Sequence, residues 1–292
     1  MTEREPYVAV AGREVLDAIV AEAYERWDCP LPYELDVCLH CCVSESVLRR
    51  LRATPVREIG PSFLAEYYDS AHSSDWYGFA HRRTLHDEIK HFLPRHLEMI
   101  SGYRPCGFDY EVALGGVDLR DPAWDKSDRD ILSRWSVAFF EVCLAEYGYA
   151  PSVSNLDKGR YSDPDPPGVD SVLVMFMRRH FDLAPLLELW LRAGSLPSLL
   201  HFVEHPIMER PILADRRLTD AFYGNPEGAA VVEQWFRRPD VKAHFAERCL
   251  DVAATASAEF LEQTADCACC WSRRDQFENT FDLLTWDLEV LG

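Results

Sequence analysis

Apolar side chains recur at spacings of three and four residues along most of this chain. Stripes of this kind follow Ser127, Asn225-Pro226-Glu227 and Pro239, and another begins near Asp275; we expect Ser127 and Asn225 to cap helices. The first stripe consists of Leu16, Ile19, Val20, Ala23, Tyr24 and Trp27. This spacing gathers apolar side chains on one face of a helix, so the sequence predicts an all-α protein.

Signals for β-strands are scarce. The run from Val172 to Met177 fits either a buried strand or a helix that Asp170 or Ser171 caps. No partner strand is evident, so we favour the helix. Residues 110–119, around Gly115-Gly116, predict at most a minor β-hairpin.

The segment 155–168 contains Asp163-Pro164-Asp165-Pro166-Pro167-Gly168, which cannot form a regular helix. We interpret it as a connector between a helical half at 1–154 and another at 169–292, and a single packed domain is the alternative. Prolines recur through the second half and predict short helices. Such helices suit layered antiparallel hairpins or a solenoid-like stack.

The chain is strongly acidic, with 49 Asp and Glu against 30 Lys and Arg and a net charge of −19. This charge disfavours nucleic acid and anionic membrane surfaces as partners and favours a basic protein. No signal peptide and no membrane-spanning stretch is recognisable. We therefore expect a cytoplasmic protein; the sequence leaves its oligomeric state open.

Ten cysteines raise the question of a metal site. Cys38 and Cys41 form one C-x-x-C pair, and Cys267 and Cys270 form a second near the other end of the chain. Four thiolates of this kind suit one structural zinc, provided that the fold brings the pairs together. The alternatives are thiols that simply pack in the core, or a redox pair.

Two motifs that contain histidine match patterns found in metalloenzymes. His201-x-x-Glu204-His205 matches the pattern of a metal-dependent hydrolase, although Pro206 disfavours helical geometry at residue 205. Glu88-x-x-His91 is half of a di-iron motif, but the chain holds no second copy. We interpret Glu88 and His91 as flanking residues of a helix whose buried stripe includes Ile89 and Phe92.

The stretches 35–44 (LDVCLHCCVS), 54–58 (TPVRE) and 87–95 (DEIKHFLPR) resemble a family of uncharacterised bacterial proteins. The resemblance covers the first third of the chain and carries no activity or catalytic residue with it. By analogy of size, acidity and helical content, the chain is similar to immunity proteins, which occupy the active site of a toxin.

These observations favour a binding protein, most concretely an immunity-type inhibitor that sequesters a toxin, and the charge favours a basic toxin. The alternatives are a metal-dependent hydrolase that uses residues 201–205 and an all-α scaffold with a structural zinc. We expect the partner to be bound by exposed acidic and aromatic side chains, namely Asp69, Asp75, Trp76, Tyr77, Asp121, Trp124 and Asp125.

Overall fold

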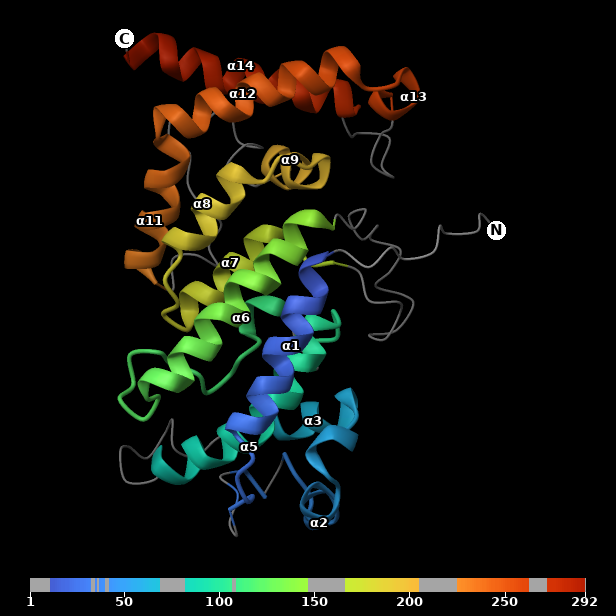
Figure 1. The fold of residues 1–292 in the computed structure, drawn as a ribbon, viewed down its shortest axis with the longest axis vertical. Helices are drawn as coiled ribbons and strands as arrows, with labels where there is room; N and C mark the ends of the chain where they lie inside the picture. The colour runs from blue at the N-terminus through green and yellow to red at the C-terminus, as the bar shows by residue number, and fades with distance from the viewer. Residues whose placement is uncertain are drawn as a thin grey trace. The chain divides into compact units, whose positions relative to one another are not determined.

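The computed structural model describes residues 11–32, 35, 37–39, 42–68, 82–106, 109–146, 166–204, 225–262 and 272–291. These residues form α-helices and two short 3₁₀ turns, and no strand occurs among them (Figure 1). The predicted all-α class is therefore confirmed. Within the same residues, no helix combines the length and the apolarity needed to cross a membrane.

The chain divides into two compact units, Met1–Val142 and Cys143–Gly292. The division falls inside a helix rather than in the proline-rich segment that we expected to act as a connector. Most of that segment, residues 155–165, lies outside the described residues, so the boundary at 155–168 stays a prediction.

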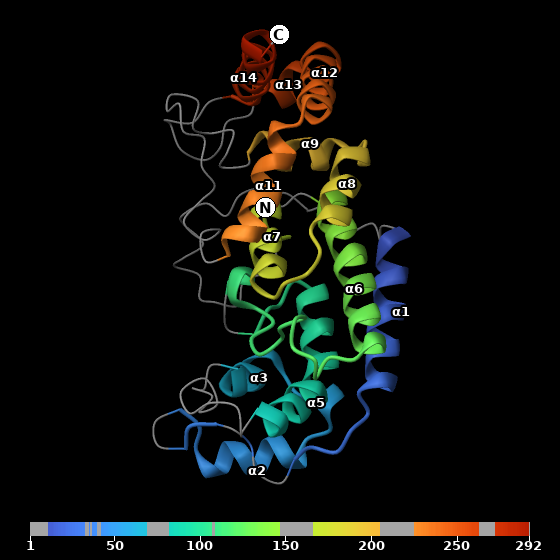
Figure 2. The same ribbon diagram turned by 90° about the vertical axis from the view of Figure 1, so that its left-hand side faces the viewer.

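The N-terminal unit is built on two long helices, α1 and α5, which pack against each other (Figures 1 and 2). Its elements are α1 (Ala11–Arg26), α2 (Glu45–Ala53), η1 (Val56–Glu58), α3 (Pro61–Tyr68), α5 (Arg82–Ser101), η2 (Tyr110–Val112) and the greater part of α6 (Lys126–Ala145). The predicted stripe of α1 is buried from Leu16 to Trp27. A second apolar cluster joins α2 and α3 to Phe92 and Met99 of α5.

The start of α6 differs from our expectation. Ser127 does not cap this helix, because Asp125 does: its Oδ1 accepts from the backbone N–H of Asp128 at 2.9 Å. Asp128 returns the contact, since its Oδ2 accepts from the backbone N–H of Asp125 at 3.3 Å. This reciprocal pair is a capping box, which satisfies two N–H groups that a helix start leaves without partners.

The C-terminal unit contains several short helices, and its two longest described helices, α12 and α14, run side by side (Figures 1 and 2). Its helices are α7 (Val169–Arg178), α8 (Ala184–Arg192), α9 (Leu196–Val203), α11 (Pro226–Arg237), α12 (Pro239–Thr255), α13 (Ala258–Leu261) and α14 (Arg273–Leu291). The ambiguous run at 172–177 lies in α7, which confirms the helical interpretation. Asn225 caps α11 as predicted, because its side chain accepts from the N–H of Gly228 at 3.0 Å.

Buried aromatic rings from four of these helices form the centre of the C-terminal unit. The rings of Phe202 and Phe245 stack with centroids 3.7 Å apart, and those of Trp190 and Trp235 stack at 5.3 Å. Aromatic pairs of this kind contribute beyond the apolar area that they bury.

Candidate binding hollow in the N-terminal unit

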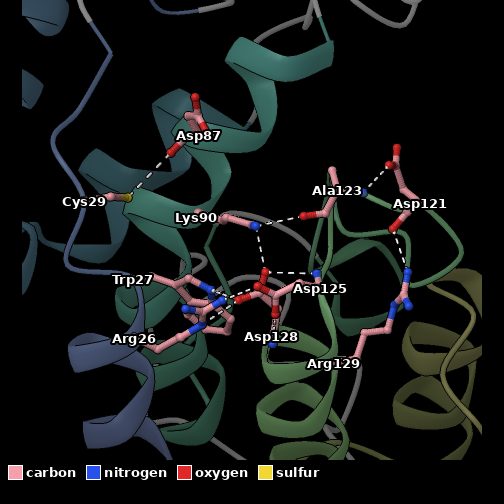
Figure 3. A network of polar contacts seen from close by, with 10 residues as sticks. All are labelled: Arg26, Trp27, Cys29, Asp87, Lys90, Asp121, Ala123, Asp125, Asp128 and Arg129. Carbon is pink, nitrogen blue, oxygen red and sulfur yellow. Dashed lines mark hydrogen bonds and ion pairs between the residues drawn. The ribbon is translucent and has the colours of Figure 1, made fainter.

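A buried carboxylate, Asp128, joins three helices of the N-terminal unit (Figure 3). It accepts from Arg26 Nε at 2.9 Å and from Trp27 Nε1 at 2.9 Å, and Lys90 Nζ lies 2.7 Å from it. The ammonium of Lys90 also donates to the carbonyl of Ala123 at 2.9 Å. These charge-assisted contacts hold α1, α5 and the start of α6 in a defined arrangement.

Contacts with α5 and α6 also fix the residues that follow α1. The carbonyl of Cys29 accepts from His91 Nδ1 of α5 at 2.7 Å. On the other side, Trp27 is held through its indole N–H by Asp128. The chain from Trp27 to Cys29 is therefore anchored to α5 and α6 rather than left as a free loop end.

This anchored segment forms one wall of a hollow of about 560 Å³, which we call the α1–α5 hollow. Its volume lies in the range of ligand-binding clefts. Its lining comes from α1, η1, α5 and the residues beside them, namely Tyr24, Glu25, Trp27, Asp28, Cys29, Pro55, Val56, Arg57, Glu58, His91 and Pro94.

The α1–α5 hollow carries an excess of negative charge. The carboxylates of Glu25, Asp28 and Glu58 are exposed, and none of them has an ion-pair partner within the described part of the chain. One cation faces them, Arg57, whose guanidinium lies 3.7 Å from the centroid of the Tyr24 ring. The hollow is therefore preformed and net acidic.

A second hollow, of about 590 Å³, lies between α1 and α6 and shares Glu25 with the first. Its other charges are largely paired. Arg134 contacts Glu22 at 2.6 Å, and Lys126, just outside the lining, contacts Asp130 at 2.6 Å. Of the carboxylates that line the two hollows, those without an ion-pair partner among the described residues are therefore Glu25, Asp28 and Glu58.

Cys29 and His91 both line the α1–α5 hollow, but they do not form an activated thiol. Burial and then the nearby charge of Asp87 raise the pKa of the Cys29 thiol. A raised pKa keeps the sulfur protonated at neutral pH, and only the thiolate is a good nucleophile. The ring nitrogen Nδ1 of His91 is engaged with the carbonyl of Cys29 rather than with its sulfur.

The expected partner-binding residues fall into two groups. Asp69, Asp75, Trp76 and Tyr77 lie outside the described residues. The second group is Asp121, Trp124 and Asp125, and Asp125 is exposed and pairs with Arg26 at 2.5 Å.

Trp124 corrects our expectation of an exposed aromatic anchor. Its side chain is fully buried, with its ring edge-on to Trp27 at 6.3 Å. Lys90 Nζ lies 5.2 Å from the ring centroid, so the indole serves as part of the packing around Asp128. Asp121 is half-buried and sits 3.1 Å from His86 Nε2. We had expected both side chains on the surface, where a partner could contact them.

The zinc prediction is left untested. Cys41, Cys267 and Cys270 lie outside the described residues, and Cys38 is half-buried. Among the described residues, no group of three or more His, Cys, Asp or Glu side chains is arranged to hold a metal ion. Other cysteines pack as small apolar side chains, as Cys106, Cys143 and Cys249 do. Burial raises the pKa of Cys249 to about 12.

The residues of the hydrolase motif make structural contacts where the chain is described. His201 is buried, and its Nε2 lies 2.9 Å from the carbonyl of Cys143 and 3.0 Å from that of Glu146. Glu204 follows the end of α9 and contacts Arg273 at 3.3 Å. His205 lies outside the described residues. Because α9 ends at Val203, the helix that carries His201 does not extend to Glu204, whereas this zinc motif needs its residues on one helix.

Glu88 is a further correction. We interpreted it as a flanking residue of its helix, but its side chain is fully buried and accepts from the hydroxyl of Tyr67 at 3.0 Å. Its neighbour in the motif, His91, is half-buried. The periodicity of α5 did not reveal this burial, since the hydroxyl that satisfies Glu88 comes from α3.

In comparisons with known proteins, no family model, no curated protein and no solved structure matched the chain. The resemblance of residues 35–95 to uncharacterised bacterial proteins therefore stays a prediction. The fold and the site define an acidic, α-helical protein with a preformed acidic hollow in its N-terminal unit.

The burial of His201 predicts a pH dependence of stability. Burial lowers the pKa of this imidazole from 6.5, and the hydrogen bonds to the two carbonyls only partly oppose the shift. The unfolded chain then binds a proton that the folded protein does not, so the free energy of unfolding falls as the pH drops below about 6.5. In denaturant titrations between pH 5 and 8, His201→Gln should reduce this dependence, because glutamine donates to the same carbonyls without titrating. An unchanged pH profile would contradict this account.

Proposed function

We propose that this protein binds a basic protein partner and, most concretely, that it is an immunity-type inhibitor which sequesters a basic toxin in the cytoplasm. The observation that carries the proposal is the α1–α5 hollow, where three exposed carboxylates lack ion-pair partners within the described residues. Both units also carry more acidic than basic residues. Complementary charge of this kind accelerates association and selects against acidic partners.

The contacts behind the hollow support this proposal. Arg26, Trp27 and Lys90 bind Asp128, and His91 binds the backbone of Cys29, so the wall of the hollow is held before a partner arrives. A surface that is already ordered loses less conformational freedom on binding.

The test of the function is co-expression with the product of the adjacent reading frame. We expect that product to arrest growth when it is expressed alone, and we expect the acidic protein to restore growth and to co-purify with it. Failure to bind the purified product, or binding without protection, would remove the immunity function.

Reversing charge at the hollow is expected to slow association with that partner. In the variant Glu25→Lys/Glu58→Lys, two unpaired carboxylates become cations, so the association rate at low salt should fall about tenfold. The matched control is Glu66→Lys, which reverses an exposed carboxylate on α3 in the same unit. Biolayer interferometry at two salt concentrations measures both rates. If each reversed charge slows association equally in the two variants, the effect comes from net charge alone and not from the hollow.

A further inference from the structure

We propose that the α1–α5 hollow binds the guanidinium group of an arginine side chain that the partner protein presents. The inference rests on the proposed function for the source of that arginine, and it adds the chemistry that the site recognises.

Three carboxylates line the hollow, and they come from two separate segments of the chain. Glu25 and Asp28 come from the end of α1 and the residues beyond it, and Glu58 comes from the end of η1. Carboxylates only accept hydrogen bonds, whereas a guanidinium donates five in a fixed planar arrangement. A single arginine can therefore contact more than one of these carboxylates at once, which a compact ammonium group cannot do as well.

The aromatic wall of the hollow already contacts a guanidinium. That group belongs to Arg57 of η1, which stacks on Tyr24 at 3.7 Å and forms no ion pair among the described residues. The Tyr24 ring is held in place, because its hydroxyl donates to Glu98 at 2.5 Å. The contact shows that the Tyr24 ring can stack with a planar cation. Arg57 balances only one of the three negative charges that line the hollow.

His91 also lines the hollow. The carbonyl of Cys29 can only accept a hydrogen bond, so Nδ1 of His91 carries the proton of that 2.7 Å contact. His91 therefore holds its side of the hollow in place. With Glu25, Asp28 and Glu58, the lining comes from α1, η1, α5 and the residues beside them, and its carboxylates suit a group that consists only of donors.

The test uses the full-length protein and three probes, N-acetyl-arginine amide, N-acetyl-lysine amide and an acetylated Gly-Arg-Gly amide. Binding is followed through the indole N–H resonance of Trp27 in heteronuclear NMR spectra. We expect a dissociation constant on the order of 1 mM for the arginine amide, as ligand efficiency gives for about 15 non-hydrogen atoms. The lysine amide should bind at least about threefold more weakly.

Variants locate the binding. Glu58→Gln and Asp28→Asn should each weaken the arginine amide about threefold, which is the scale of an exposed charge contact. Glu66→Gln, the matched control on α3, should leave it unchanged. Arg57→Ala should strengthen binding about threefold, because it removes the competing cation and clears the face of Tyr24. A merely structural role of Arg57 would not produce a gain.

The outcomes separate this inference from the proposed function. If the arginine and lysine amides bind equally, or if Glu58→Gln behaves like Glu66→Gln, the arginine site is wrong even where the toxin still binds. If the arginine amide binds but the Gly-Arg-Gly amide does not, the hollow does not accept an arginine that is part of a polypeptide, and the proposed occupant is wrong. If both arginine probes bind at the hollow while no toxin is neutralised, the immunity function fails and the arginine site stands.

Discussion

Replacing Asp128 by alanine is expected to destabilise the N-terminal unit by about 3 to 5 kcal/mol. The carboxylate is fully buried and accepts from Arg26, Trp27 and the backbone of Asp125, while Lys90 lies 2.7 Å away. Its removal leaves two cations without their buried counter-charge and one indole N–H without an acceptor. The penalty therefore exceeds the value of any single contact.

Urea unfolding followed by circular dichroism measures this loss, and hydrogen exchange read by mass spectrometry locates it. Exchange should accelerate in α1, α5 and the first turns of α6, with α12 and α14 unaffected. Asp128→Asn should cost less, because the amide keeps one acceptor. The control on the same helix is Asp130→Asn, whose exposed contact with Lys126 contributes only about 0.3 to 0.5 kcal/mol. Equal effects at the two positions would refute the role given to Asp128.

The helices were predictable because their signals are local. The stripe from Leu16 to Trp27 recurs with the period of one helix face, and it is buried along α1. Asn225 and Pro226 mark the start of α11 as expected. The cap of α6 was misplaced at Ser127 because several adjacent residues can cap a helix, and the contact between Asp125 and Asp128 decides the matter.

The candidate site was not predictable, since its residues meet only in the folded unit. Glu25 on α1 and Asp28 just after it are ordinary exposed acids, and Glu58 lies thirty residues beyond Asp28 along the chain. The burial of Trp124 was not predictable either, because aspartates surround this residue in the sequence. In the folded unit, Lys90 contacts both Asp128 and the carbonyl of Ala123, and these contacts hold the segment of Trp124 in the interior. The one available signal was the acidic spacing of Glu22, Glu25 and Asp28 beside the apolar stripe of α1.

The Asp128 network and the α1–α5 hollow depend on the same few residues. Trp27 belongs to both, since its indole binds Asp128 and its ring lines the hollow. Loss of Asp128 should therefore disturb the arginine site as well as stability. The conservative variant Asp128→Asn, if folded, separates the two effects, because it alters the wall without touching any carboxylate in the hollow.

Gly116→Ala is expected to destabilise the same unit by about 2 to 4 kcal/mol, for two independent reasons. Gly116 has a φ of 80°, in the left-handed region, which costs a residue with a side chain on the order of 1 kcal/mol or more. In addition, a Cβ at this position would lie 2.1 Å from Cδ1 and 3.0 Å from Cγ1 of Ile89. Ile89 is buried in α5, so moving it disturbs a packed core at a further cost of about 1 to 3 kcal/mol.

The adjacent glycine is a matched control for this prediction. A Cβ on Gly115 would meet Tyr68 Cδ1 at an ordinary 3.9 Å, so Gly115→Ala should change the free energy of unfolding by less than about 1 kcal/mol. The steric part of the Gly116→Ala loss can be isolated with Ile89→Val, which removes Cδ1. In a double-mutant cycle, the two substitutions together should cost less free energy than the sum of the single losses, because the steric clash is counted only once. The part of the Gly116→Ala loss that persists in the Ile89→Val background measures the backbone strain. Strict additivity would show that the new methyl group does not meet Ile89, and equal losses at positions 115 and 116 would show that φ is not the cause.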